Sequence, residues 1–426
     1  MQGPDELPEL LDDCVHCGFC LPTCPTYVLW GEEMDSPRGR IHLMKQHSEG
    51  APLSAPMVQH FDQCLGCMAC VTSCPSGVQY DRLIEMTRAT VEREHPRSPA
   101  ERAIREAIFS LFPYPKRLRA LRGPLRAYQK AGLDRLVRRS GVLERLSPAL
   151  AAMERLAPPL ERTPRLPERV TARGPRRATV AMLTGCVQRE FFPGVNTATA
   201  RVLAMEGCDV LIPREQGCCG ALSLHAGREE EARAFARRTV VTFEAVDVIV
   251  VNAAGCGSAM KEYRALLADE PEWAGRADAL SAKTRDLAEF LADLGPRAER
   301  HPVPATVAYH DACHLAHAQG IRSQPRLLLA GIPQLTVREI ADPDICCGSA
   351  GTYNLLEPEA AADLGDRKAA DVAATEAELL VAANPGCSMQ IANALSRKGT
   401  PMAVAHTAQV LDASLRGLGR RALRLP

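Results

Sequence analysis

Two cysteine runs of identical spacing occupy the first part of this chain of 426 residues. Cys14-x2-Cys17-x2-Cys20-x3-Cys24-Pro25 is followed by Cys64-x2-Cys67-x2-Cys70-x3-Cys74-Pro75. Three thiolates spaced in this way on a tight turn can reach three irons of one cube. Two structural zinc sites are the alternative, but zinc does not require this order twice. The runs therefore predict two [4Fe–4S] clusters.

The fourth cysteine of each run follows a longer gap and precedes a proline, so it points away and binds the other cluster. The first ferredoxin site is then Cys14, Cys17, Cys20 and Cys74, and the second ferredoxin site is Cys64, Cys67, Cys70 and Cys24. The long spacer between the runs contains the partly helical segment DSPRGRIHLMKQ. We therefore expect a helix-rich two-cluster domain over residues 1–95.

The last 250 residues contain an internal repeat built around cysteines. The first copy contains, in order, VAMLTGC, QGCCGAL and VIVVNAAGCG, and the second contains VAYHDACH, DICCGSA and LLVAANPGC. The distance in sequence between matching cysteines of the two copies is nearly constant. This regularity indicates a duplication. The first CCG site is Cys186, Cys218, Cys219 and Cys256, and the second CCG site is Cys313, Cys346, Cys347 and Cys387.

Adjacent cysteines fit disulfide geometry poorly, but both can face one metal where a glycine relaxes the backbone. The alternative is that these cysteines pack as small apolar side chains, which their matched phase disfavours. The pattern leaves open whether the sites hold a further iron–sulfur cluster or zinc. Cys208 has no counterpart and is expected to be structural. His225, His310, His314 and His317 are either satisfied polar residues or partners of the sulfurs.

Apolar β-rich runs alternate with helical stretches in both repeats. We expect strands at 178–183, 209–213, 246–252, 305–310, 335–340 and 378–384, and helices at 197–206, 229–245 and 358–374. Such alternation predicts parallel sheets, with ligands at the carboxyl ends of the strands. The predicted fold class is α/β: the ferredoxin-type domain, a helical linker at 96–176, and two duplicated CCG domains at 177–300 and 301–426.

The linker is rich in proline, leucine and arginine. Residues 116–177 contain 17 Lys+Arg and 5 Asp+Glu, although the net charge of the whole chain is zero. Its prolines are expected to cut its helices into short pieces. The segment is either a solvated spacer or a docking surface for an acidic partner or anionic lipid.

Composition and missing motifs exclude several functions. Balanced charge and an aromatic content of 4% disfavour nucleic-acid binding. The acidic N-terminus is not a secretory signal, and no apolar run is long enough to span a membrane. Clustered cysteines in a long chain indicate a reducing, cytoplasmic compartment. We find no GxGxxG, P-loop or GxSxG motif, so we predict no catalytic residues and no flavin site in this chain.

Segments along nearly the whole chain resemble the iron–sulfur subunit of glycolate oxidase. CVHCGFCLPTCPTY, CLGCMACVTSCPSGVQY, LTGCVQREFFPGVNTATARVLAMEGCDV, YHDACHLAHAQ, CCGSAGTYNLLEPE and ANPGCSMQI carry this resemblance. It implies a complex whose FAD-binding subunits oxidise glycolate to glyoxylate. This chain would pass the electrons to quinone or the respiratory chain, peripherally, at the inner face of the cell membrane. The iron–sulfur subunits of D-lactate and anaerobic glycerol-3-phosphate dehydrogenases share the plan and remain alternatives.

Heterodisulfide reductase subunits also carry CCG domains, but their pattern ends in CxxC. Here the repeats end in Cys256-Gly-Ser-Ala and Cys387-Ser-Met-Gln, so the fifth cysteine is missing from both. This departure disfavours a thiol–disulfide reductase. A redox sensor or metal-stabilised scaffold is disfavoured because it would not need two ferredoxin motifs. For the basic linker, the interrupting prolines favour an acidic face of the flavin subunits slightly over a membrane.

Overall fold

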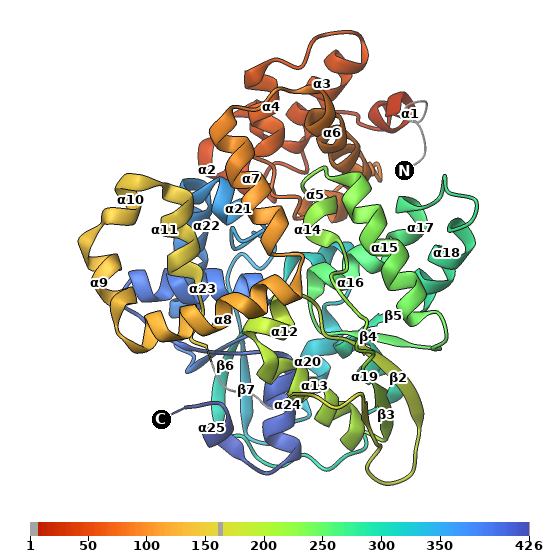
Figure 1. The fold of residues 1–426 in the computed structure, drawn as a ribbon, viewed down its shortest axis with the longest axis vertical. Coiled ribbons are helices and arrows are strands. Elements are labelled where there is room, and N and C mark those ends of the chain that lie inside the picture. Colours follow the sequence, from red (N-terminus) through yellow and green to blue (C-terminus); the bar gives the residue numbers. More distant parts are fainter. Residues whose placement is uncertain (1–6, 161–164, 426) are drawn as a thin grey trace.

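The N-terminal segment folds into a group of helices (Figure 1). The structure is a computed structural model that describes residues 7–160 and 165–425. Ser36 caps the third helix by accepting a hydrogen bond from the Gly39 N–H, and Pro37 starts it. The elements are α1 (Leu7–Asp12), α2 (Pro25–Trp30), η2 (Glu33–Asp35), α3 (Pro37–Ser48), α4 (Ala55–Asp62), α5 (Ala69–Thr72) and α6 (Tyr80–Glu94).

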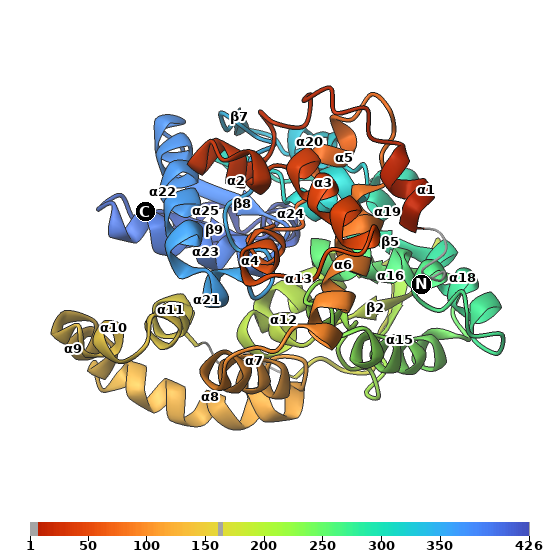
Figure 2. The same ribbon diagram turned by 90° about the horizontal axis from the view of Figure 1, so that it is seen from above.

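The linker forms helices α7 (Pro99–Leu111), α8 (Pro115–Lys130), α9 (Leu133–Ser140), α10 (Val142–Leu146) and α11 (Pro148–Leu156). Three of the five begin with proline, whose missing N–H costs nothing at that position. The expectation that prolines cut the helices was wrong at Pro124, which lies inside α8. The preceding residue is Gly123, which has no Cβ to clash with the proline ring. Figure 2 shows α8–α11 as an arm along one side of the molecule.

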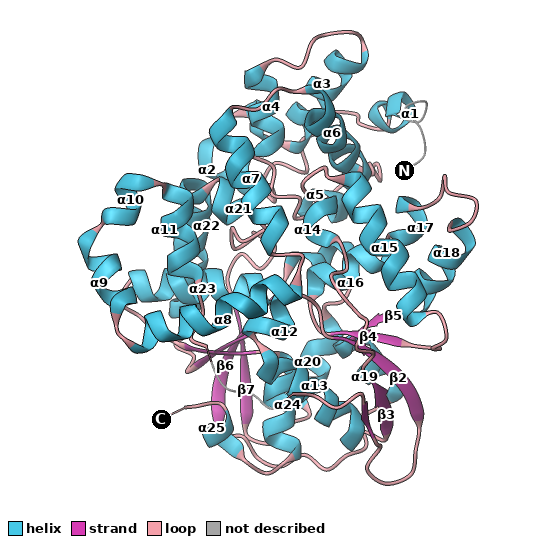
Figure 3. Ribbon diagram, viewed as in Figure 1, coloured by secondary structure: helices cyan, strands magenta, loops and turns pink. Residues whose placement is uncertain are grey.

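Two separate sheets confirm the parallel α/β class (Figure 3). The first sheet has the order β1-β3-β2-β4-β5, and only the β1–β3 pair is antiparallel. The second sheet has the order β7-β6-β8-β9 and is entirely parallel. The strands are β1 (Arg169–Val170), β2 (Ala178–Leu183), β3 (Cys208–Leu211), β4 (Ile249–Val251), β5 (Thr284–Asp286), β6 (Ala305–His310), β7 (Leu335–Glu339), β8 (Leu379–Ala382) and β9 (Ala403–Ala405). Strand β1 comes from inside the 96–176 segment but joins the first repeat's sheet.

The helices of the two repeats cover the sheets. In the first repeat they are α12 (Val187–Phe191), α13 (Pro193–Met205), α14 (Ala221–Leu224), α15 (Glu229–Phe243), α16 (Ala254–Lys261), α17 (Tyr263–Leu266), α18 (Ala274–Lys283) and α19 (Leu287–Leu294). In the second they are the π-helical turn η3 (His314–Ala318), α20 (Ser323–Ala330), α21 (Tyr353–Leu356), α22 (Pro358–Ala374), α23 (Pro385–Arg397), α24 (Thr407–Leu415) and α25 (Gly419–Ala422).

The two repeats share one core, because helices of one pack directly against helices of the other. Helix α13 packs against α24, and α19 packs against α20. Buried residues of both sheets, such as Val180 and Val307, belong to one apolar cluster. Arg201 on α13 also donates two hydrogen bonds, of 2.8 and 2.6 Å, to the carboxylate of Asp412 on α24. This packing fixes the cysteines of one repeat relative to those of the other.

Candidate functional site

The first ferredoxin site lies near the surface. Its four cysteines line one small cavity, which Cys70 of the neighbouring site also touches. Cys17 is exposed, and Cys14, Cys20 and Cys74 are half-buried. Two large apolar side chains beside them face solvent, Val15 with 68% and Phe19 with 65% of their surface exposed.

The second ferredoxin site is buried. Cys24, Cys64, Cys67 and Cys70 line a second small cavity, and all four are buried. The structure thus places Cys24 with the second run and Cys74 with the first, which is the crossed grouping expected from the spacing. Burial raises the pKa of the Cys67 and Cys70 thiols well above the ordinary value. Buried thiols around a cavity suit a metal cluster, because coordination removes the protons that burial otherwise retains.

Two arginines place positive charge at the second ferredoxin site. Arg40 is 1% exposed, donates hydrogen bonds to the carbonyls of Asp35 and His60, at 2.5 and 2.6 Å, and forms a 3.2 Å ion pair with the Asp35 carboxylate. Arg88 donates to the carbonyl of Cys64. Burial raises the pKa of the Cys64 thiol, but both guanidinium groups outweigh it, so the pKa lies below the ordinary value. The same charges would stabilise the reduced, more negative state of a cluster held there.

The first ferredoxin site has a weaker positive environment. Its nearby arginine, Arg38, donates a 3.2 Å hydrogen bond to the His16 carbonyl but also forms a 2.5 Å ion pair with Glu33. Glu33 therefore offsets the charge of Arg38.

Both CCG sites lie at the carboxyl ends of their sheets, where β2 and β6 end and helices begin. Cys186 and Cys313 follow these two strands, whereas Cys256 and Cys387 are each the third residue of a helix, α16 and α23. The N-terminal end of a helix favours negative charge, and therefore thiolates.

Backbone conformation and close packing explain why a glycine follows each cysteine pair. Gly220 and Gly348 both have φ +85°. A Cβ at Gly220 would lie 3.1 Å from the Ala232 carbonyl oxygen, and one at Gly348 would lie 2.7 Å from the Ala361 oxygen. Only glycine allows the pair to turn inward while the loop packs this closely on α15 or α22.

The thiols of each CCG site contact one another. In the first, the neighbouring thiols of Cys186 and Cys219 raise the pKa of Cys218, and Cys219 also contacts Cys256. In the second, the Cys346 thiol raises the pKa of Cys313, and Cys347 contacts both Cys346 and Cys387. The structure thus brings each predicted set of four together. Cys208 lies on β3 in the apolar core, apart from both sets.

The four histidines singled out in the sequence lie around these sites. His225 and His314 pack together with ring centroids 4.8 Å apart, and His314 Nδ1 is 3.6 Å from the Cys313 sulfur. Burial lowers their pKa values to about 4 and about 3, so both rings are neutral. His310 ends β6 and is 2% exposed, and His317 contacts Thr72 in the N-terminal domain at 2.7 Å.

The second ferredoxin site adjoins the second CCG site. Cys67 lies in one buried cluster with Cys346, and Cys313 packs against that cluster. The contacting rings of His225 and His314 lie between the second CCG site and the first CCG site, where His225 lies near Cys219. Figure 1 shows the N-terminal domain above the elements that carry the CCG cysteines. Sequence reasoning did not find this adjacency, because no local pattern links residues so far apart in the chain.

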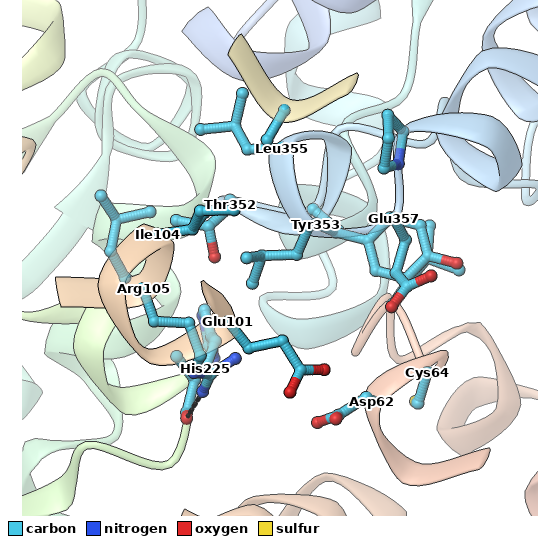
Figure 4. A pocket seen from close by; sticks show the side chains of 18 of the residues that line it. Asp62, Cys64, Glu101, Ile104, Arg105, His225, Thr352, Tyr353, Leu355 and Glu357 are labelled. Atoms are coloured by element: carbon cyan, nitrogen blue, oxygen red, sulfur yellow. Dashed lines mark hydrogen bonds between the residues drawn. The ribbon is translucent and has the colours of Figure 1, made fainter. Parts of the chain in front are cut away.

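A cavity of about 410 Å³ opens beside the second ferredoxin site (Figure 4). Cys64, Asp62, helix α7, the α21 region, His225 and His314 line it. The carboxylates of Asp62, Glu101 and Glu357 point into this space in Figure 4. Burial, followed by the charges of Asp62 and Glu101, raises the pKa of Glu357 to about 7. The Tyr353 hydroxyl is buried without a hydrogen-bond partner among the described residues.

Comparisons with protein families cover most of the chain. A 4Fe-4S dicluster domain model matches residues 10–78, and a cysteine-rich domain model matches 180–261 and 307–392. A model of the linker region of the glycolate oxidase iron–sulfur subunit matches residues 100–157.

Full-length relatives share this plan. A probable glycolate oxidase iron–sulfur subunit from Bacillus subtilis is 39% identical over 92% of this chain and 90% of its own length. The glycolate oxidase iron–sulfur subunit from Escherichia coli is 36% identical over 91% of both chains. Lactate utilization protein A from an Exiguobacterium species is 34% identical, over 55% of this chain and 96% of its own.

A solved structure has a related fold. The crystal structure of a hypothetical protein from Helicobacter pylori matches with a TM-score of 0.55 at 9% identity, over 99% of this chain and 74% of that one. At this identity the likeness concerns the fold alone.

Proposed function

This chain belongs to the family of glycolate oxidase iron–sulfur subunits, and from that premise we propose that it is the electron-transfer subunit of a glycolate-oxidising complex. FAD-binding partner subunits would convert glycolate to glyoxylate. Bound [4Fe–4S] clusters would supply the ability to take and release one electron at a time. The observation that carries this proposal is the adjacency of three sites: Cys70 touches the cavity of the first ferredoxin site, and Cys67 lies in one buried cluster with Cys346 of the second CCG site.

Electrons would enter at the first ferredoxin site. It is the more exposed of the two, and Val15 and Phe19 offer an apolar contact surface beside Cys17. Burial of such side chains against a partner is favourable and brings the partner within reach of the cysteines. The positive charges of Arg40 and Arg88 then favour onward transfer to the second ferredoxin site.

The cavity beside Cys64 suits a small organic acceptor, for which a respiratory quinone is the proposed class. Its volume of about 410 Å³ lies within the usual range of small-molecule sites. The Tyr353 hydroxyl, which has no partner among the described residues, can donate a hydrogen bond to a quinone carbonyl. Reduction of a quinone to a quinol takes two electrons and two protons, and Glu357, with a pKa of about 7, can relay protons from solvent.

The arm suits peripheral contact with the cytoplasmic face of the cell membrane. Helices α9 and α10 bury no residue. Leu136 and Leu146 are 64% and 72% exposed, and the basic side chains of Arg135, Arg139 and Arg145 are exposed among them. Basic residues at an anionic surface contribute about 1 kcal/mol each, and apolar side chains add to this.

Two observations show what kind of membrane contact this surface could make and which part of the arm is held to the rest of the molecule. Across residues 7–160 and 165–425 no helix has the length and hydropathy of a membrane span, so contact through the described part would be peripheral. Arg119 and Arg122 form ion pairs with the buried carboxylate of Glu190 in the first repeat, at 2.9 and 3.7 Å. These two arginines therefore hold α8 to the body. The exposed mixture of basic and apolar residues on α9 and α10 favours lipid over an acidic protein face.

Purification of the tagged chain from its native cell, followed by analysis of partner proteins and flavin, tests the proposed function. A flavoprotein partner and glycolate-driven reduction support it. Purification of the chain alone with disulfide-reducing activity contradicts it. D-lactate is the competing substrate, and assaying both acids with the same complex separates the two. The lactate utilization proteins match only 55% of this chain, which favours glycolate.

A further inference from the structure

One buried histidine distinguishes the second CCG site from the first. A ring nitrogen of His310 and the sulfurs of Cys347 and Cys387 all lie within 4.8 Å of one another. All three residues are at most 3% exposed. Imidazole nitrogen and thiolate sulfur are the ligand pair that zinc, and some iron–sulfur centres, accept together.

The imidazole has an unused ring nitrogen. His310 Nε2 is buried and has no hydrogen-bond partner among the described residues. The same holds for Nε2 of His225 and His314, but among the described histidines His310 is the one grouped with two cysteine sulfurs within 4.8 Å. A buried polar atom without a partner is costly, so a native structure needs a reason to keep it. A metal bound between His310, Cys347 and Cys387 would supply that reason.

The first repeat has no counterpart to this histidine. His310 is the last residue of β6, and the last residue of the corresponding strand β2 is Leu183. Leu183 is 2% exposed and packs in the apolar cluster that includes Cys219. The two CCG sites therefore differ in donor set although their cysteines are in matched phase.

The other candidate for a fifth donor in the second repeat is directed elsewhere. A CxxC ending would place its second cysteine at Gln390. The Gln390 side chain donates a 2.6 Å hydrogen bond to the Ala361 carbonyl and accepts one of 3.1 Å from Asn354. Its amide is satisfied by protein groups, which leaves His310 as the additional donor.

We propose that His310 is a metal ligand of the second CCG site, which therefore binds its metal through both sulfur and nitrogen, whereas the first CCG site uses sulfur alone. The proposal rests on the proposed function only in requiring a metal centre at this site. With the four thiolates, His310 gives the site five donors where a structural zinc ion or one cluster takes four, so His310 would take the place of one thiolate. Neutral imidazole in place of thiolate raises the reduction potential of an iron–sulfur centre. For an iron centre, the second CCG site would thus hold electrons more strongly than an all-thiolate site.

Spectroscopy of the purified full chain tests this assignment without an activity assay. If the metal is iron, pulsed EPR of the reduced protein with ¹⁵N-labelled histidine shows a nitrogen coupled to the centre. If the metal is zinc, X-ray absorption shows a nitrogen at about 2.0–2.1 Å beside sulfurs at about 2.3 Å. Absence of nitrogen from the coordination of the metal at this site overturns the proposal, and so does a second CCG site that holds no metal.

Variants assign the nitrogen to His310. His310→Leu, which copies the first repeat, should abolish the nitrogen signal and lower the reduction potential of an iron centre. His310→Cys retains a donor, so it should keep the metal and replace the nitrogen with sulfur even if the leucine variant fails to fold. His42→Leu, at an exposed histidine on α3, is the control that should keep the signal. A nitrogen signal that survives both His310 variants contradicts the assignment, while glycolate-driven reduction of the ferredoxin sites would still be expected.

Discussion

The hydroxyl of Thr72 and Nδ1 of His317 lie 2.7 Å apart across the boundary between the N-terminal domain and the second CCG repeat. Thr72 ends the short helix that carries Cys70, and His317 lies in the turn that follows Cys313. The contact therefore joins a turn of the second ferredoxin site to a turn of the second CCG site. Electron transfer depends on such fixed adjacency, because the sites lie on segments that are remote in sequence.

Cys24→Ser tests the crossed ligation of the ferredoxin sites. Cys24 lies with Cys64, Cys67 and Cys70, so its loss should damage the second site and leave the first. EPR of the reduced protein should lose the signal of the Cys64–Cys70 cluster, and the iron content should fall by about four atoms per chain. Cys208→Ala, which changes a core thiol outside all four sites, should retain both signals. Loss of only the cluster bound by Cys14, Cys17 and Cys20 would refute the crossed grouping.

Phe19→Glu tests electron entry at the first ferredoxin site. Phe19 is 65% exposed, so the charge should be tolerated by the fold but should weaken contact with the flavoprotein. Stopped-flow measurements should show slower reduction by the partner, by roughly tenfold for a loss of about 1.4 kcal/mol, and unchanged reduction by dithionite. Leu327→Glu, at a site 62% exposed on α20, is the matched control. Equal rates for wild type and the Phe19 variant would place entry elsewhere.

Several elements were predictable from sequence because their patterns are local. The strands at 178–183 and 305–310 and the helix at 358–374 were predicted to the residue, since a buried central strand is continuously apolar and a long helix keeps its period. Strands β1, β5 and β9 are only two or three residues long, which is too short for a recognisable hydrophobic pattern. Their pairing is decided by neighbours that are distant in the chain.

Of the residues at these sites, the sequence predicted only the cysteines and the nearby histidines as candidates, and not how the histidines lie relative to the cysteines. Spacing predicted which cysteines lie together, but it could not show that Arg40 and Arg88 lie near Cys64 or that His310 lies beside Cys347. The packing of α13 against α24 was equally hidden, because burial along a helix does not say which distant element covers it. These relationships arise from tertiary packing and leave no periodic signal.

Charge reversal on the arm tests membrane contact. Lys130, Arg135, Arg139 and Arg145 are exposed, and their joint change to Glu should weaken binding to anionic vesicles by well over tenfold at low salt, since each residue contributes about 1 kcal/mol. Wild-type binding should itself fall as salt shortens the Debye length below about 8 Å. Sedimentation with phosphatidylglycerol and phosphatidylcholine vesicles measures both effects.

A second arm variant separates apolar insertion from charge. Leu136→Ser with Leu146→Ser should also weaken vesicle binding, whereas Leu327→Ser with Leu418→Ser, at exposed positions outside the arm, should not. If all these variants bind as wild type does, or if wild type ignores anionic lipid but binds the flavoprotein through the same arginines, the arm is not a membrane anchor.

Glu357→Gln tests the carboxyl group in the cavity. Burial raises the pKa of Glu357 from 4.5 to about 7, so the folded state holds this proton at a pH where the unfolded state has lost it. Its stabilising contribution is present below pH 4.5 and is lost as the pH rises through 7. The glutamine variant should therefore be more stable than wild type above pH 7, by about 1–2 kcal/mol after solvent screening.

Urea unfolding between pH 5 and 8 measures this difference, with Glu359→Gln, an exposed carboxylate on the same rim, as the control. The Glu357→Gln substitution should also slow quinone reduction in the complex, because the relay proton is gone. An unchanged pH profile of stability would show that Glu357 titrates normally.

The most direct measurement of the central claim is EPR of the intact complex after addition of glycolate. The account predicts that glycolate reduces the iron–sulfur centres of this chain when the flavoprotein is present. It also predicts that added quinone reoxidises them and that the isolated chain does not respond to glycolate at all. Centres that stay oxidised in the complex, or an isolated flavin-free chain that oxidises glycolate by itself, would contradict the proposal that this chain is an electron relay.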